Sequence, residues 1–239
     1  MNSRRFVPGT TATKPRISAI IPVYNEAGKV GLVLETLRHV TWISELLVVD
    51  DGSTDSSADE IRLAAQSDPR LRMLQHVGNR GKGQAIFSGW QATNSPFILL
   101  LDADLFGLEP YHVYDLMEPV ITNRVDMSIG QFKNGHFASD FSHLMTPWLS
   151  GQRCLRANLL GKISFRAAQG YGFETALTVA AGQLGWRTVR VPMQAVWHLS
   201  SESRRGIWIG GKNRFKMYRQ IVSAWYQARG LHRLVYDRE

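Results

Sequence analysis

Apolar residues along the chain follow two alternating spacings, one typical of strands and one typical of helices. From Ile17 onward, short apolar runs are each followed by a segment whose apolar residues stand three or four positions apart. The strand-like runs are Ile17–Val23, Glu45–Asp50, Leu71–His76, Phe97–Ala103 and Asp126–Gly130. The helix-like segments are Lys29–Val40, Ser53–Gln66, Gly81–Thr93 and Pro110–Thr122. This repetition predicts an α/β fold, a Rossmann-like and mostly parallel sheet with helices on both faces.

The pattern is looser after about residue 131. We expect helices at Ser150–Leu160 and Gly170–Trp186, a pair of strands within Arg187–Ser200, and a basic amphipathic helix at Asn213–Leu231. Residues 1–16 carry four bases and no acid, and residues 204–239 carry nine bases and two acids. We therefore expect a flexible leader (1–16), one folded domain (17–203) and a basic C-terminal helical tail (204–239).

Composition narrows the class of protein. The chain has 239 residues, 44% of them hydrophobic, which suffices for one substantial core. Its single cysteine, Cys154, excludes a disulfide framework and a Cys-rich zinc site and fits a reducing compartment, so we expect a cytoplasmic location. No run approaches the roughly 18 apolar residues of a membrane span, and the two N-terminal arginines are not followed by the apolar run of a secretory signal. Because the net charge of +8 is carried by the two ends, the core gives no indication of nucleic-acid binding.

Clusters of acidic and polar residues follow three of the expected strands, with the sequences YNEAG, DDGSTD and DAD. The carboxyl ends of parallel strands share one edge of a sheet, and ligands bind there. Asp102 and Asp104 would share a face if their strand continued through them. A divalent cation would relieve their repulsion, and Mg²⁺ prefers one or two carboxylates together with phosphate oxygens. The alternative is a turn whose acids are simply solvated.

The DDGSTD cluster and Lys82 also allow two interpretations. One of Asp50 and Asp51 could hydrogen-bond a nucleotide, or both could serve only the turn and the helix cap. Lys82 follows a glycine at an expected helix start, where it could meet a phosphate or be a plain surface lysine. The glycine-rich motifs of dinucleotide and P-loop sites are absent.

The sequences IPVYNEAG, LLVVDDGSTD, NRGKGQA and LLLDADL, in this order and spacing, resemble family 2 glycosyltransferases over roughly residues 17–130. The resemblance implies the GT-A fold, a nucleotide-sugar donor, and Mg²⁺ or Mn²⁺. It also implies a nucleotide-binding half at 17–131 and an acceptor half at 132–203. The residues that it places at the donor are Pro22, Tyr24, Asn25, Glu26, Asp51, Lys82, Asp102, Ala103 and Tyr171. Asp51 would bond the base, and Asp102 and Asp104 would hold the metal against the donor diphosphate.

The second half is similar to two branches of this family. The sequence GYGFETAL, preceded by SGQRCL, resembles polyprenyl-phosphate hexose transferases, including dolichyl-phosphate mannose synthases. The sequence YGFE followed by His198 resembles glucosyl-3-phosphoglycerate synthases, which implies that His198 is a third metal ligand. This chain has Val196 where that second branch has an arginine. The alternative for His198 is a histidine whose hydrogen bonds are satisfied at a strand end.

The catalytic candidates are Asp104, Glu174 and Lys82. Glu174 could take a proton from an acceptor hydroxyl, bind the sugar, or be a helix-start acid without chemistry. A phosphate acceptor is already ionised and needs no strong base. The acceptor-side candidates, which lie beside Ser150, are Gly151, Gln152 and Arg153, and an arginine suits an anionic acceptor.

The sequence thus predicts metal-dependent transfer of a hexose from a UDP- or GDP-sugar to an anionic acceptor, a polyprenyl phosphate at a membrane face. A small phosphorylated acceptor such as 3-phosphoglycerate is the alternative. The basic tail could lie on an anionic membrane as a peripheral contact, or pack on the domain. A non-catalytic subunit that binds sugar nucleotides and a homodimer both stay open. A nucleotidyltransferase would need a glycine-rich first loop, which VYNEAG does not provide.

Overall fold

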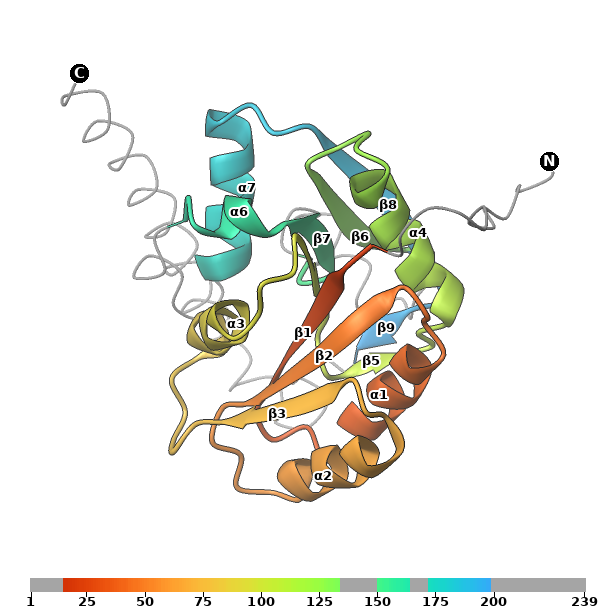
Figure 1. Cartoon of the computed structure of the whole chain (residues 1–239), viewed down its shortest axis with the longest axis vertical. Helices are drawn as coiled ribbons and strands as arrows, with labels where there is room; N and C mark the ends of the chain where they lie inside the picture. The colour runs from red at the N-terminus through yellow and green to blue at the C-terminus, as the bar shows by residue number, and fades with distance from the viewer. Residues whose placement is uncertain (1–14, 134–149, 164–171, 199–239) are drawn as a thin grey trace, which may run out of the picture.

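A computed structural model describes residues 15–133, 150–163 and 172–198 of the chain. Its main feature is a seven-stranded sheet with the order β3-β2-β1-β4-β7-β6-β8 (Figure 1). The strands are β1 (Ile17–Val23), β2 (Ile43–Asp50), β3 (Leu71–Gln75), β4 (Phe97–Leu100), β6 (Met127–Lys133), β7 (Arg153–Arg156) and β8 (Thr188–Gln194). Only β7 runs against its neighbours, β4 and β6. The expected mostly parallel sheet is therefore confirmed.

Helices cover both faces of this sheet, as the alternating pattern predicts. They are α1 (Val30–Arg38), α2 (Ser57–Ser67), α3 (Lys82–Gln91), α4 (Pro110–Ile121), α6 (Ala157–Leu160) and α7 (Gly172–Gln183). Helices α1, α2 and α4 pack in one hydrophobic cluster, and α3, α6 and α7 pack in a second. Two further short strands, β5 (Leu105–Phe106) and β9 (Trp197–His198), form an antiparallel pair of their own. The helical tail expected at 204–239 and the leader up to residue 14 lie outside the described residues.

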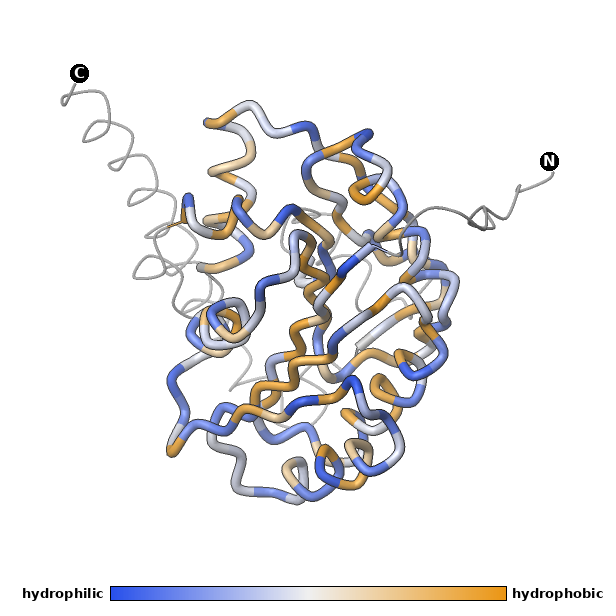
Figure 2. The backbone as a smooth tube through the Cα atoms, viewed as in Figure 1, coloured by the Kyte–Doolittle hydropathy of each residue, from blue (hydrophilic) through white to orange (hydrophobic). Residues whose placement is uncertain are grey.

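The central strands are apolar on both faces, which is why the sheet can be covered twice. In β2, Leu46 and Val48 belong to one cluster, whereas Leu47 and Val49 belong to the other. All four side chains are fully buried, and burying an aliphatic side chain contributes roughly 1.5–3 kcal/mol. Figure 2 shows these strands as a hydrophobic centre between more polar outer segments.

The prediction of a helix at Ser150–Leu160 is wrong for most of this range. Residues Arg153–Arg156 form the strand β7 instead, and only Ala157–Leu160 are helical. The strand inserts between β4 and β6, where Leu99 pairs with Cys154 and Ile98 with Leu155. Cys154 and Leu155 are buried in opposite clusters. The two neighbouring strands therefore decide the conformation of a segment whose own spacing is ambiguous.

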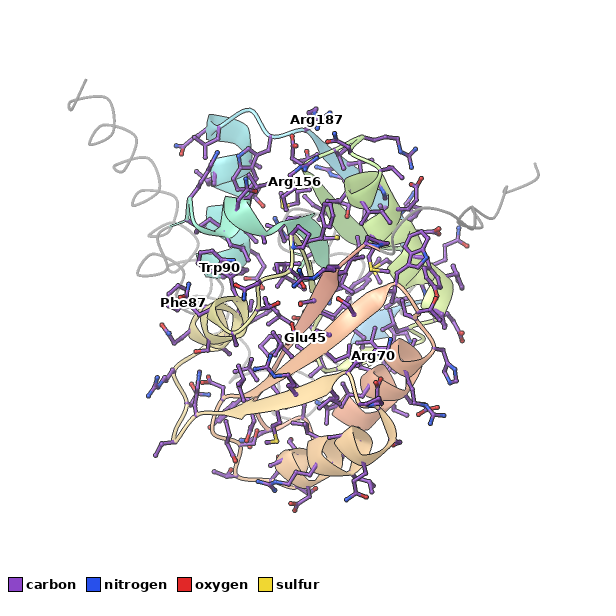
Figure 3. The ribbon with its side chains drawn as sticks, viewed as in Figure 1. Glu45, Arg70, Phe87, Trp90, Arg156 and Arg187 are labelled. Atoms are coloured by element: carbon purple, nitrogen blue, oxygen red, sulfur yellow. The ribbon has the colours of Figure 1, made fainter. Side chains whose placement is uncertain are left out.

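An acidic residue joins the amino ends of β6 and β8. Asp126 accepts hydrogen bonds from the backbone N–H of Arg187 at 2.9 Å and from its guanidinium at 3.1 Å. The Arg156 guanidinium lies 3.4 Å away on β7, and both arginines are labelled in Figure 3. The Arg187 hydrogen bonds, against a smaller opposing effect of burial, lower the pKa of Asp126 to about 2.

We expect Asp126→Asn to lower the free energy of unfolding by about 1–2 kcal/mol at pH 7. A depressed carboxyl pKa stabilises the fold above the unfolded-state pKa of roughly 4, and this contribution is lost as the pH falls toward the folded-state pKa. Urea unfolding at pH 7 and pH 3 should therefore show a difference between variant and wild type that shrinks in acid. Asp59→Asn is the control, because the Asp59 side chain is 79% exposed. A difference independent of pH would contradict the assignment.

Candidate active site

The carboxyl ends of β1, β2, β3 and β4 lie at one edge of the sheet because these strands are parallel. The first two loops at this edge are joined directly. The Asn25 side-chain oxygen accepts the Thr54 N–H at 2.8 Å, and the Asn25 N–H donates to the Ser53 hydroxyl at 3.0 Å. Asn25 has a φ of 55°, a left-handed conformation that asparagine tolerates better than most residues. The motif YNEAG is thus shaped by its contacts with DDGSTD.

Three charged side chains from distant parts of the sequence meet at this edge. The Lys82 ammonium, on the first residue of α3, lies 2.6 Å from Asp102 Oδ1 and 2.5 Å from Glu174 Oε1. Asp102 follows β4, and Glu174 is in the first turn of α7. The Lys82 side chain is 31% exposed and that of Glu174 only 5%. Two of the expected catalytic candidates and one expected metal ligand therefore lie together.

The electrostatics of this cluster favour charged lysine. Burial by itself would lower the pKa of Lys82, but the two carboxylates outweigh it and hold that pKa above its ordinary value. Two carboxylates share one ammonium, which leaves the cluster with a net negative charge. Such a cluster suits a further cation, since carboxylate oxygens are preferred ligands of Mg²⁺.

The segment before β7 closes the other side of Asp102. Gln152 Nε2 donates to Asp102 Oδ2 at 3.0 Å, and the Ser150 hydroxyl donates to Gln152 Oε1 at 3.0 Å. A Cβ atom on Gly151 would lie 2.6 Å and 2.7 Å from the two Asp102 oxygens and 2.7 Å from the Lys82 nitrogen. Glycine at residue 151 therefore leaves the space that the charged pair occupies.

Glu174 carries a second oxygen without a partner. Among the described residues, Glu174 Oε2 is buried and has no hydrogen-bond partner. A buried carboxylate oxygen in that state costs free energy.

Arg153 is turned into the core, so its expected contact with an acceptor stays a prediction. It is fully buried, and its guanidinium donates to the backbone oxygen of Glu174 at 3.2 Å and to the Thr178 hydroxyl at 3.0 Å. Its Nε donates to the Ser150 backbone oxygen at 2.9 Å. The arginine thus fixes the start of α7 and the turn before β7, and so holds Glu174 and Gln152 in place.

Asp51 is also turned inward. It is 2% exposed, and its carboxylate accepts the N–H groups of Arg80 at 3.0 Å and Gly81 at 2.7 Å. His76 Nδ1 lies 2.6 Å from the same carboxylate. Asp50 accepts the Ser53 N–H at 3.0 Å and serves the turn. This arrangement fits the alternative in which both acids hold loops, so a base contact by Asp51 stays a prediction.

The other donor-side candidates lie around the same edge. Tyr24 is 44% exposed, Pro22 and Glu26 are half-buried, and Ala103 is buried. Glu26 pairs with Lys29 within its own loop. Tyr171 lies outside the described residues.

The expected metal ligands are only partly described. Strand β4 ends at Leu100, and Asp102 and Asp104 lie in the loop before β5. The two side chains are therefore not aligned by a common strand. The backbone of His198 pairs with Leu105, next to Asp104, which is half-buried. Within the described ranges, no three His, Cys, Asp or Glu side chains are grouped to hold a metal ion. The His198 side chain is outside that description, so the triad stays a prediction.

His76 is a residue that the sequence analysis did not single out. It lies directly after β3, at the same edge as the three recognised clusters. A polar residue at a fourth parallel strand end was the signal available in the sequence.

No helix within the described part of the chain is long and apolar enough to span a bilayer.

Comparison with known proteins identifies the class. Residues 18–174 match the model of glycosyl transferase family 2, so the chain belongs to this family and is a glycosyltransferase. An undecaprenyl-phosphate mannosyltransferase from Micrococcus luteus is 29% identical over 211 residues, which cover 79% of this chain and 87% of that protein. An undecaprenyl-phosphate 4-deoxy-4-formamido-L-arabinose transferase from Photorhabdus laumondii subsp. laumondii is 40% identical over 96 residues, which cover 38% of this chain and 29% of that protein.

The fold is that of a known GT-A enzyme. Glucosyl-3-phosphoglycerate synthase from Mycobacterium tuberculosis, in complex with Mg²⁺ and uridine diphosphate, superposes with a TM-score of 0.73. It is 22% identical, and the match covers 90% of this chain and 80% of that chain. A second structure of that enzyme, with Mn²⁺, UDP-glucose and phosphoglyceric acid, gives a TM-score of 0.71 at 23% identity, with coverage of 90% and 80%. The GT-A fold class expected from the sequence is confirmed.

The glycine before Gln152 offers a specific test of the site. We expect Gly151→Ala to reduce transferase activity by at least about tenfold, because its methyl group displaces the Asp102–Lys82 pair. The displaced atoms are ends of partly exposed side chains, so the melting temperature should change little. Gly182→Ala is the matched control, since a Cβ there meets nothing within 4 Å. Full activity in Gly151→Ala would show that this pair is not needed where the structure places it.

Proposed function

We propose that this glycosyltransferase moves a hexose from a nucleoside diphosphate sugar to a polyprenyl phosphate. The observation that carries the proposal is the meeting of Lys82, Asp102 and the buried Glu174 at the carboxyl edge of the sheet. The similarity to a polyprenyl-phosphate mannosyltransferase over most of both chains supports the acceptor class. UDP or GDP as the nucleotide stays open.

In this reaction an acceptor phosphate oxygen forms a bond with the anomeric carbon of the sugar, and the bond from that carbon to the donor diphosphate breaks. The leaving nucleoside diphosphate takes the bonding electron pair. A phosphate acceptor is ionised at neutral pH, so no residue needs to remove its proton. The chain's task is to bind, orient and stabilise developing negative charge.

Each residue of the cluster fits part of this task. Lys82 supplies positive charge toward the donor diphosphate. Glu174 Oε2, buried without a partner among the described residues, would accept a sugar hydroxyl. Asp102, with Asp104 and His198 as proposed co-ligands, would hold Mg²⁺ or Mn²⁺, which when bound neutralises diphosphate charge. Arg153 would support the site from within, through its hydrogen bond to the Glu174 backbone oxygen.

Thermal melting against a panel of donors tests the proposal. UDP-glucose, UDP-GlcNAc, UDP-galactose and GDP-mannose are each added with and without Mn²⁺. A donor at about 100 times its dissociation constant adds about 2.7 kcal/mol of stability, so one donor should raise the melting temperature in a metal-dependent way. No shift with any donor, in folded protein, would favour a non-catalytic role.

The acceptor is then tested directly with the donor that binds. Undecaprenyl phosphate in detergent micelles should yield a lipid-linked sugar and free nucleoside diphosphate, and 3-phosphoglycerate should not. The reverse outcome would favour a small soluble acceptor, such as the phosphoglyceric acid bound in the complex of glucosyl-3-phosphoglycerate synthase. We propose that the enzyme acts at the cytoplasmic face of a membrane, and liposome flotation of full-length protein with and without anionic lipid tests that location.

A further inference from the structure

His76 joins three elements at the active edge of the sheet. Its side chain is 9% exposed. Nδ1 lies 2.6 Å from Asp51 Oδ1, and Nε2 lies 2.9 Å from the Ser88 hydroxyl on α3. Both oxygens of Asp51 also accept backbone N–H groups. Because an ionised carboxylate can only accept, the imidazole donates from Nδ1. The Ser88 hydroxyl can rotate to donate to Nε2.

Asp51, in turn, fixes the start of α3. Its carboxylate accepts the N–H groups of Arg80 and Gly81, the two residues before Lys82. Gly81 has a φ of 91°, which only glycine adopts readily, so the helix begins abruptly at Lys82. The neighbouring loops also touch closely, since a Cβ on Gly52 would lie 2.6 Å from the backbone of Gly78. The direction of the first helical residue is therefore set by Asp51.

Helix α3 is thus held at two points by one imidazole. His76 reaches the helix start through Asp51 and contacts Ser88, six residues further along, directly. A rigid helix held at its start and in its body has a fixed rotation about its axis. That rotation decides where the Lys82 side chain points, and its ammonium is the group shared by Asp102 and Glu174.

We infer that His76 is a positioning residue, which acts through Asp51 and α3 to place the Lys82 ammonium against the donor diphosphate. This inference rests on the proposed function, because it takes Lys82 as a donor-binding group. It accounts for a buried aspartate and a histidine side chain with only 9% exposure beside a loop whose residues 77–80 are exposed.

Two substitutions separate the contacts of His76. In His76→Asn, the side-chain amide can still donate from near the Nδ1 position to Asp51. In His76→Gln, the amide reaches the Nε2 position near Ser88 and loses the Asp51 contact. We expect His76→Gln to weaken binding of the nucleoside diphosphate about tenfold, which corresponds to roughly 1.4 kcal/mol, and His76→Asn to weaken it much less. Ser88→Ala removes only the contact between His76 Nε2 and the Ser88 hydroxyl. This variant replaces His76→Gln in the experiment if His76→Gln does not fold.

A double-mutant cycle with Lys82→Met decides the mechanism. Dissociation constants of UDP and GDP, with Mn²⁺ present, are measured by calorimetry for the full-length wild type, both single variants and the double variant. If His76 acts through Lys82, His76→Gln should cause no further loss of affinity in the Lys82→Met background. Its effect on melting temperature without ligand should persist there, because that effect does not depend on Lys82.

The outcomes are distinct. Additive losses of affinity in the cycle, with wild-type binding intact, overturn the positioning role and leave the proposed function standing. Equal losses in His76→Asn and His76→Gln also overturn it. Binding of neither nucleotide by the wild type overturns the proposed function, and this inference with it.

Discussion

Replacing Asp102 with asparagine is expected to lower kcat by at least about a hundredfold, because the cation that Asp102 is proposed to hold would stabilise the developing charge of the leaving diphosphate. The carboxylate lies 2.6 Å from the Lys82 ammonium and accepts a hydrogen bond from Gln152 at 3.0 Å. Asparagine keeps the shape and can still accept from Gln152, but it carries no charge. The variant therefore loses attraction for a divalent cation without losing packing.

The fold should tolerate this change. Lys82 keeps Glu174 as its partner at 2.5 Å, and the Asp102 side chain is 25% exposed. Partly exposed ion pairs contribute about 0–1 kcal/mol, so the melting temperature of the ligand-free protein should change by no more than a few degrees.

Manganese binding separates the possible results. Wild type and Asp102→Asn are titrated with Mn²⁺ in the presence of nucleoside diphosphate, with the signal of free Mn²⁺ followed by electron paramagnetic resonance. We expect weaker Mn²⁺ binding in step with the lost turnover, and no change in Asp59→Asn. Normal turnover and Mn²⁺ binding in Asp102→Asn would remove Asp102 from the site.

The sheet as far as β6 could be predicted because its signals are local. The alternation of buried residues in β2 and the helical spacing in α3 are each contained within one short segment. The same locality explains the failures. The apolar positions of Ser150–Leu160 are compatible with either a helix or a strand. Pairing with both β4 and β6 makes Arg153–Arg156 a strand, and this pairing depends on residues far away in the sequence.

The sequence best predicted those site residues that lie at the ends of expected strands and helices. Asp102 lies at the end of an expected strand and Lys82 at the start of an expected helix, and both belong to the observed cluster. The contact between Lys82 and Glu174 joins residues 92 positions apart, and its geometry depends on the whole sheet. The burial of individual side chains could not be predicted from the sequence. Arginine is usually a surface residue, but Arg153 lies in the core.

Burial of the Arg153 guanidinium beside the site costs free energy, because a charged group loses its hydration there. Burial lowers the pKa of its guanidinium to about 10, although Glu174 acts in the opposite direction. Its hydrogen bonds include those to the backbone oxygens of Ser150 and Glu174 and to the Thr178 hydroxyl. The bond from Arg153 to the Glu174 backbone oxygen holds the first turn of α7, from which the Glu174 carboxylate extends. If Glu174 binds substrate as proposed, this contact would preorganise it.

Glu174→Gln is expected to lower kcat/KM about tenfold to a hundredfold, the range of a hydrogen bond to a charged group. Glutamine can still accept from Lys82 through its amide oxygen. The atom at the position of Oε2 becomes an amide nitrogen, which cannot accept a sugar hydroxyl. Activity should therefore fall although the lysine contact survives.

The stability of Glu174→Gln should be unchanged or slightly higher than that of the wild type. In the wild type, Oε2 is a buried carboxylate oxygen without a hydrogen-bond partner among the described residues. A neutral amide costs less to leave unsatisfied than a charged oxygen. We expect the ligand-free melting temperature of Glu174→Gln to equal or exceed that of the wild type. Glu35→Gln, whose side chain is 60% exposed, should change neither activity nor stability.

The dependence of kcat/KM on pH distinguishes the two roles of Glu174. If Glu174 binds the sugar, Glu174→Gln lowers the whole profile and keeps its shape, because a phosphate acceptor needs no base. If Glu174 removes a proton, the acidic limb of the profile disappears in the variant. Donors lacking one hydroxyl add a second criterion, since one of them should lose affinity for the wild type but not for Glu174→Gln. We expect the unchanged shape, because the unpartnered oxygen of a buried carboxylate is better suited to accept a hydroxyl than to serve an acceptor that is already ionised.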